Sequence, residues 1–243
     1  MRANLSRVLK ETGRNQTELS GLVREGYLNF GRYLHELYFI PRIDQNFLKL
    51  RLEVRGRENL DQAFQRGKGV ISLTAHLGNW ELAGIFAALL GYPITAVALP
   101  HRGRVMNHFF LQRRKVKGVK VVVLGKQTKR IITALRQKEL VALLGDRTFG
   151  PPYLNLQFFG KEALLPAGPA QLAVKLGSPI VPGFLVRENE KYILFFEPPI
   201  YPDLKKDSLD AINDLAERAI VYLEKYIGAY PSQWIVFDRI WGC

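Results

Sequence analysis

The stretch VISLTAHLGNWELAG, residues 70–84, decides how the centre of this chain folds. It opens with a short apolar run, Val70 to Ala75, which has the length of a buried β-strand. Apolar residues then recur at helical spacing from Asn79 to Leu90, and asparagine is a common helix cap. Gly78 lies between the two elements and gives the backbone the freedom to turn. The stretch therefore predicts a strand, a tight loop and a helix, which is the building unit of an α/β domain.

Short strands and helices alternate in the rest of the sequence. The predicted strands cover residues 50–54, 70–75, 94–99, 119–124, 140–145, 180–186 and 192–196. The predicted helices cover residues 17–38, 58–66, 79–90, 105–117, 127–137, 169–176 and 208–229. Short apolar strands separated by helices are typical of an α/β fold with a mostly parallel central sheet flanked by helices. Residues 147–166, rich in Gly, Pro and aromatic residues, are predicted to form a long functional loop.

The helix predicted at residues 17–38 has an aromatic-rich face beside Arg24, Arg32 and Arg42. This face either packs on the rest of the chain, as apolar helical stripes usually do, or lies on a membrane surface. A chain of 243 residues can bury one sizeable core. We therefore expect an N-terminal helical segment over residues 1–45 and a single α/β domain over residues 46–243.

The composition is strongly basic. Lys and Arg number 35 against 22 Asp and Glu, and the net charge of +13 should attract phosphates, anionic lipid headgroups or an acidic protein. A nucleic-acid partner is disfavoured, because the basic residues are spread from Arg2 to Arg239 and no known nucleic-acid motif is present. No apolar run approaches the roughly 20 residues of a membrane span and no signal peptide opens the sequence, so membrane contact is expected to be peripheral. The single cysteine, Cys243, fits a reducing compartment.

His76 and Glu81 are the residues of the opening stretch that carry chemistry. In a continuous helix, five residues advance about 500°, and the two side chains would point about 140° apart. If His76 instead lies in the loop and Glu81 lies in the first helical turn, the carboxylate can reach back to the imidazole. The pair then predicts a general base at the carboxyl end of a strand, where open α/β sheets bind their ligands.

The sequence offers no nucleophile of its own for this base. It has no Gly-x-Ser-x-Gly elbow and its one cysteine is residue 243, so the nucleophile is expected to be a substrate hydroxyl. Water would replace that hydroxyl if the protein were an acyl-thioester hydrolase. A zinc site is disfavoured because His-Glu-x-x-His is absent, and because His101 and His108 lie on another predicted segment. We therefore expect no metal.

Five blocks of the sequence resemble the bacterial late lipid A acyltransferase family, within the wider group of His-x4-Asp/Glu glycerolipid acyltransferases. They are HLGNWE (76–81), LQRRKVKGVKVV (111–122), LLGDRTF (143–149), FFGKEALLPAGPAQLAVKLGSPIVPGF (158–184) and YPSQWIVFDRIW (230–241). The blocks occur in the family's order and span most of residues 50–241. The resemblance implies a glycerolipid acyltransferase-like fold.

The resemblance also implies an activity. The acyl chain would come as a thioester on acyl carrier protein or coenzyme A, with no further cofactor, and the acceptor would be a hydroxyl of a lipid or glycolipid such as a lipid A precursor. His76 would deprotonate that hydroxyl, and Glu81 would orient His76. Family members usually begin with a membrane-spanning helix, which this sequence does not contain. Attachment to the anionic surface on the cytoplasmic side of the inner membrane would then depend on basic charge and on the helix at residues 17–38.

Further residues are expected to bind substrate. Those that resemble family positions, or stand near them as cations, are Asn79, Arg102, Arg104, Arg113, Arg114, Asp146 and Arg147. Among them, Arg113 or Arg114, together with Asp146, would organise the acceptor and the cleft. A tunnel for the acyl chain is expected to be walled by Phe149, Tyr153, Phe158, Phe159 and Leu165. Backbone N–H groups around Gly78 and Asn79 are expected to face the oxyanion that forms when a thioester is attacked.

Overall fold

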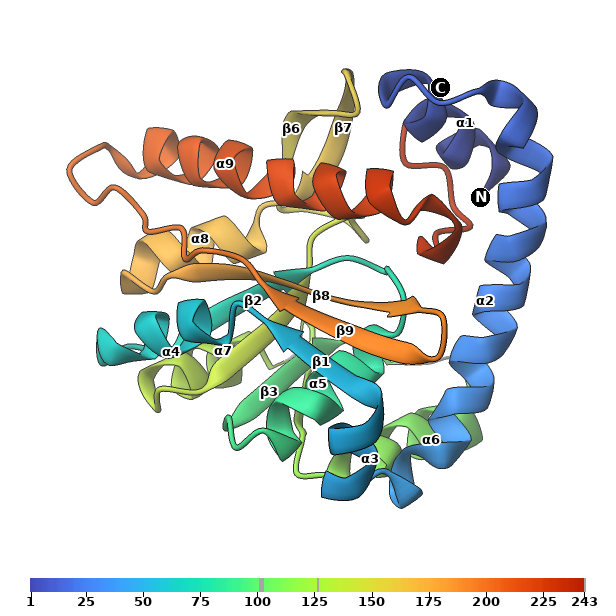
Figure 1. The fold of residues 1–243 in the computed structure, drawn as a ribbon. Helices are drawn as coiled ribbons and strands as arrows, with labels where there is room; N and C mark the ends of the chain where they lie inside the picture. The colour runs from blue at the N-terminus through green and yellow to red at the C-terminus, as the bar shows by residue number, and fades with distance from the viewer. Residues whose placement is uncertain (101–102, 126, 243) are drawn as a thin grey trace.

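A seven-stranded sheet forms the centre of the computed structural model, which describes residues 1–100, 103–125 and 127–242 (Figure 1). Its strands are β1 (Leu52–Arg55), β2 (Val70–Thr74), β3 (Ile94–Ala98), β4 (Lys120–Val123), β5 (Leu140–Leu144), β8 (Ile180–Glu188) and β9 (Lys191–Phe196). They lie in the order β1-β9-β8-β2-β5-β3-β4, and every neighbouring pair is parallel except β8 with β9. The predicted α/β fold with a mostly parallel sheet is confirmed.

Helices cover both faces of the sheet, because alternate strand residues are buried on opposite sides. The α-helices are α1 (Arg2–Glu11), α2 (Leu19–Phe39), α3 (Gln45–Arg51), α4 (Arg57–Gln65), α5 (Trp80–Leu89), α6 (Arg104–Lys115), α7 (Thr128–Arg136), α8 (Gly168–Leu176) and α9 (Ser208–Ala229). Short 3-10 turns are η1 (Gln16–Glu18), η2 (Ile40–Arg42) and η3 (Pro231–Gln233). Helices α2 to α6 pack with Leu140 on one face, whereas α7, α8 and α9 pack with Val141 on the other.

The region predicted as a long loop contains an antiparallel hairpin, β6 (Tyr153–Phe158) with β7 (Lys161–Pro166). Its strands alternate between exposed and buried residues, and Leu156, Phe158 and Leu165 face the core. The alternation was therefore present in the sequence, but the Gly and Pro residues around it masked the pattern.

The N-terminal helices pack against the end of the chain. The Nδ2 of Asn4 donates to the carbonyl oxygens of Val236 (3.2 Å) and Asp238 (2.7 Å). Helix α2, which matches the helix predicted at residues 17–38, buries Tyr33 and Leu37 in the core. Within the residues that the structure describes, no helix combines the length and the apolar character needed to cross a bilayer.

The register of the sheet sets the position of the site. Strands β2 and β5 pair in parallel with Thr74 opposite Leu144, so both strands end at the same edge. His76 follows two residues after Thr74, and Asp146 follows two residues after Leu144. Figure 1 shows α2 running along one side of the molecule, beside the end of β8.

Candidate active site

The loop after β2 is held in one conformation by its neighbours. Gly78 has a φ of +59°, and a Cβ there would lie 1.9 Å from the carbonyl oxygen of Leu185, so only glycine fits. The N–H of Gly78 donates to the carbonyl oxygen of Gln233 (2.9 Å), and the N–H of Ile235 donates to that of His76 (2.7 Å). The segment after α9 therefore supports the loop that carries His76.

The imidazole of His76 pairs with Asp146. Its Nδ1 lies 2.8 Å from Oδ1 of Asp146, and the backbone N–H of His76 donates to Oδ2 (2.9 Å). The indole Nε1 of Trp234 donates to the same Oδ2 (2.8 Å). The Asp146 side chain is 0% exposed, whereas that of His76 is 12% exposed. With Nδ1–H bonded to the carboxylate, Nε2 is the nitrogen left to accept a proton.

The charge of Asp146 is maintained by these contacts. Burial acts to raise the pKa of the carboxyl group, but the attraction of His76 and the hydrogen bonds from His76 and Trp234 outweigh it, and the pKa lies below its ordinary value. The group is therefore ionised at neutral pH. A buried carboxylate in this position fixes the tautomer of the imidazole and stabilises the imidazolium that forms when Nε2 takes a proton.

The predicted contact between Glu81 and His76 is wrong. Glu81 is in the first turn of α5, but its two carboxylate oxygens accept from Nε and Nη2 of Arg114 on α6, both at 2.6 Å. The two side chains are 9% and 7% exposed. The guanidinium offers a bidentate, fully charged partner, and the imidazole already has Asp146. Glu81 therefore joins α5 to α6, and Arg114 is buried in that pair rather than open to an acceptor.

Trp80 links His76 to α2. Its ring lies edge-on to the imidazole, with centroids 5.0 Å apart, and it stacks on Tyr33 at 4.5 Å. Burial, together with the charge of Glu81, raises the pKa of Tyr33, so its hydroxyl stays protonated. These rings form an apolar wall beside the imidazole.

The other residues predicted to bind substrate are scattered. Asn79 caps α5 by accepting from the N–H of Leu82, and its Nδ2 donates to Glu36 (2.7 Å). Arg104 is exposed at the start of α6, and Arg102 lies outside the described residues. The Gly78 N–H predicted to face an oxyanion is taken by Gln233.

Arg113 and Arg147 both lie against aromatic rings. The guanidinium of Arg113 sits 4.6 Å from the Phe109 ring centroid, and that of Arg147 sits 4.2 Å from the Phe149 ring centroid. Arg147 also pairs with Asp238 at 2.7 Å. Each has a buried Nε without a hydrogen-bond partner among the described residues.

An apolar cavity of about 340 Å³, including the space at its mouth, lies between the sheet, α8, α9 and the hairpin. Its lining includes Leu73, Gly145, Leu156, Leu165, Ala216 and Leu223. Gly145 directly precedes Asp146, so the cavity begins next to the edge of the sheet where His76 and Asp146 lie. Of the predicted tunnel residues only Leu165 lines it, because Phe158 and Phe159 pack against Trp234 and Trp241.

Metal ligands are not grouped in the described part of the chain, where no three His, Cys, Asp or Glu side chains are placed to hold an ion.

Sequence reasoning missed the contact of Asp146 with His76 and the hydrogen bond that Trp234 donates to Asp146. The signal for the first was that two predicted strands each end in a small residue followed by a polar one, Ala75-His76 and Gly145-Asp146. The structure adds that these two strands are neighbours. The approach of Trp234 depends on tertiary packing.

Known proteins resemble this chain over most of its length. The model of the bacterial lipid A biosynthesis acyltransferase family matches residues 1–242. The chain is 25% identical over 245 residues to the phosphatidylinositol mannoside acyltransferase of Mycolicibacterium smegmatis, covering 99% of this chain and 78% of that protein. It is 28% identical over 222 residues to the protein of the same name from Mycobacterium tuberculosis, covering 88% and 68% of the two chains. It is 26% identical over 193 residues to a lipid A biosynthesis acyltransferase of Haemophilus influenzae, covering 77% and 58%. The chain therefore belongs to the bacterial lipid A biosynthesis acyltransferase family and is an acyltransferase.

Proposed function

We propose that this acyltransferase moves a fatty acyl chain from a thioester to a hydroxyl group of a glycolipid, with His76 as the general base. The observation that carries the proposal is the His76–Asp146 pair, with Nδ1 2.8 Å from the carboxylate and Nε2 left to accept a proton. The relatives named for phosphatidylinositol mannoside and for lipid A both support a glycolipid acceptor. The donor would be acyl carrier protein or coenzyme A carrying the acyl chain, and no further cofactor takes part.

The reaction proceeds by direct transfer. The acceptor hydroxyl gives its proton to Nε2 of His76 while its oxygen bonds to the thioester carbon, and the carbonyl oxygen takes up the negative charge. When the carbonyl re-forms, the C–S bond breaks, and the departing thiolate takes the proton from the imidazolium. Asp146 remains ionised throughout and stabilises the imidazolium between the two proton transfers.

The apolar cavity next to Gly145 supports a place for the acyl chain. Its described lining consists of apolar side chains, glycine and proline, so it suits a hydrocarbon chain and offers no side-chain partner to a polar group. Gly145, which lines the cavity, is adjacent to Asp146 in the chain. An acyl chain bound in the cavity would therefore have its thioester carbon near His76. Enlarging a side chain such as Ala216, which lines the cavity, would then shorten the chains accepted.

We also propose that α2 and α6 bind the membrane surface peripherally, on the cytoplasmic side of the inner membrane. Large apolar side chains on these helices are exposed: Tyr27, Leu28, Tyr38, Phe39, Val105 and Met106. The rings of Tyr38 and Phe109 lie 5.1 Å apart, which joins the two helices into one face. Arg24, Arg32, Arg42 and Arg104 on or beside them suit anionic headgroups.

The proposal is tested with the His76→Ala variant. Wild-type protein is incubated with an acyl thioester and a glycolipid acceptor, and mass spectrometry follows acylated acceptor and free fatty acid separately. We expect acylated acceptor from the wild type and none above background from His76→Ala at unchanged melting temperature. Free fatty acid as the main wild-type product would mean a hydrolase, and wild-type turnover by His76→Ala would remove the imidazole from the mechanism.

A further inference from the structure

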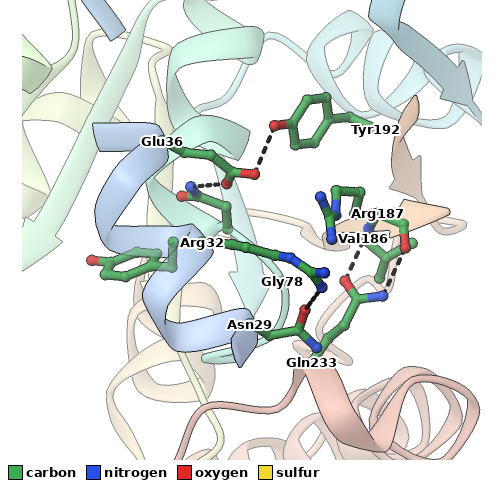
Figure 2. Close-up of a pocket in the computed structure, with 10 residues that line it drawn as sticks. Asn29, Arg32, Glu36, Gly78, Val186, Arg187, Tyr192 and Gln233 are labelled. Atoms are coloured by element: carbon green, nitrogen blue, oxygen red, sulfur yellow. Dashed lines mark hydrogen bonds between the residues drawn. The ribbon is translucent and has the colours of Figure 1, made fainter. Parts of the chain in front are cut away.

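A second recess lies beside the loop that carries His76 (Figure 2). It measures about 300 Å³, including the solvent at its mouth, and is bounded by α2, the end of β8 and the η3 turn. Gly78 and Asn79 form part of its wall, only two and three residues after His76. The apolar cavity has a different lining, so the two are separate features of the molecule.

Two arginines give the recess its chemistry. Figure 2 shows the guanidinium groups of Arg32, from α2, and Arg187, from β8, directed toward the same part of the recess. Arg32 donates to Oδ1 of Asn29 (3.0 Å). The side chain of Arg187 makes no hydrogen bond or ion pair within the described ranges. Two convergent cations with free N–H groups match the oxygens of an anion.

The carboxylates near these arginines already have other partners. Glu36, which lines the recess, accepts from Nδ2 of Asn79 and from the hydroxyl of Tyr192, each at 2.7 Å. Burial and then the charge of Glu36 raise the pKa of Tyr192, so this hydroxyl remains a donor to Glu36. Beyond Arg187, Glu188 accepts from Tyr230 and Glu190 pairs with Arg51. None of these carboxylates accepts a hydrogen bond from Arg187, so its guanidinium N–H groups are left for a ligand.

The neutral polar groups of the recess are also occupied. Gln233 accepts from the N–H of Arg187 (2.9 Å) and donates to its carbonyl oxygen (2.8 Å). The Nδ2 of Asn29 donates to the carbonyl oxygen of Ser232 (2.9 Å). A sugar would need amide and carboxylate groups that can exchange partners, whereas a phosphate needs the guanidinium N–H groups that are free.

We propose that this recess binds a phosphate group, held by Arg187 and Arg32, next to the catalytic loop. Phosphate esters occur in lipid headgroups and in the carriers of acyl thioesters, so the phosphate belongs either to the acceptor or to the donor. This link to a substrate rests on the proposed function. The anion site itself rests only on the two arginines and the occupied groups around them.

Binding is tested with inorganic phosphate and with glycerol 3-phosphate, by calorimetry and by the NMR signals of arginine Nε–H groups. The test variant is the double substitution Arg32→Gln/Arg187→Gln, which removes both charges and leaves the backbone bonds of Arg187 to Gln233 in place. The matched control is Arg136→Gln, an exposed arginine on α7. We expect the double variant to bind about 10- to 100-fold more weakly and the control to bind as the wild type does. Equal binding by wild type and double variant, or equal loss in the control, would overturn the site.

The transfer assay then identifies the source of the phosphate. A raised KM for the acceptor with an unchanged KM for the thioester assigns the phosphate to the acceptor headgroup, and the reverse assigns it to the donor. Unchanged KM values for both substrates would overturn the link to the reaction. A wild-type protein that binds phosphate but transfers no acyl group would defeat the proposed function and leave the anion site standing.

Discussion

Asp146 and Glu81 are both buried carboxylates near the end of β2, but one meets a titratable base and the other a permanent cation. Asp146 follows the end of β5, seventy residues after His76, and bonds the imidazole at 2.8 Å. Glu81 is only five residues from His76 and bonds Arg114 at 2.6 Å through both oxygens. An imidazole gains and loses a proton, whereas a guanidinium remains charged. The first pair is therefore suited to catalysis and the second to holding helices together.

The largest effect is expected from Asp146→Asn. The substitution removes the charge that stabilises the imidazolium, and kcat should fall by about 10²- to 10⁴-fold, measured with saturating thioester and acceptor. The control is Asp238→Asn, which removes a 74% exposed carboxylate that pairs with Arg147. A kcat near the wild-type value in Asp146→Asn would show that catalysis does not need the charge of Asp146, and the distinction between Asp146 and Glu81 would then be wrong.

The next largest effect concerns folding. Glu81→Gln leaves the buried guanidinium of Arg114 without its counter-charge and should lower the free energy of unfolding by about 3–5 kcal/mol, measured by urea denaturation. The kcat of the folded fraction should fall less than in Asp146→Asn. The double variant Glu81→Leu/Arg114→Met removes both charges and should recover most of the lost stability. If the double variant does not recover stability, the Glu81–Arg114 pair contributes more than the neutralisation of a buried charge.

A smaller effect is expected from Gly78→Ala. The new Cβ would meet the carbonyl oxygen of Leu185 at 1.9 Å, and the φ of +59° is itself unfavourable for alanine. The free energy of unfolding should fall by more than about 1 kcal/mol. Gly13→Ala is the matched control, because Gly13 has a φ of +67° with nothing within 4 Å of its Cβ position. An equal loss in both variants would show that the backbone angle, and not the contact with β8, sets the cost.

The smallest effect is a dependence of stability on acidic pH. The pKa of Asp146 is lowered from its ordinary value of 3.8 in the folded protein, so its contribution to stability is fully present above that value. The contribution is lost as the pH falls through the lower folded-state pKa. Chemical denaturation between pH 2 and pH 6 should therefore show a shallower loss of stability in Asp146→Asn than in the wild type. Parallel curves would indicate that other carboxylates dominate acid unfolding.

Much of the fold follows from local patterns. The apolar run at Val70 and the cap at Asn79 predicted the strand and helix around His76 within one or two residues. The hairpin at residues 153–166 was not predicted, because the Gly and Pro residues around it, such as those at 150–152, hid its alternation of apolar and polar residues. Helix α3 was also missed, and α1 was expected only as part of the N-terminal helical segment at residues 1–45. The α1 helix is stabilised partly by contacts such as Asn4 with Val236 and Asp238, which only the folded chain provides.

The candidate site was predictable in part. His76 was identified from its place after a strand, but its partner was assigned by closeness in sequence. The register of β2 with β5, Thr74 opposite Leu144, brings Asp146 to the imidazole, and strand order is not visible in one sequence. The same limit applies to Trp234 and to the recess between Arg32 and Arg187, whose residues come from widely separated parts of the chain.

The support of His76 by residues after α9 has a consequence for biosynthesis. Trp234 donates to Asp146, and Ile235 donates to the carbonyl oxygen of His76. A nascent chain whose helices up to α9 have left the ribosome still lacks both bonds. The arrangement of His76 and Asp146 described above is thus completed only when residues 234 and 235 have been synthesised and have folded against the loop.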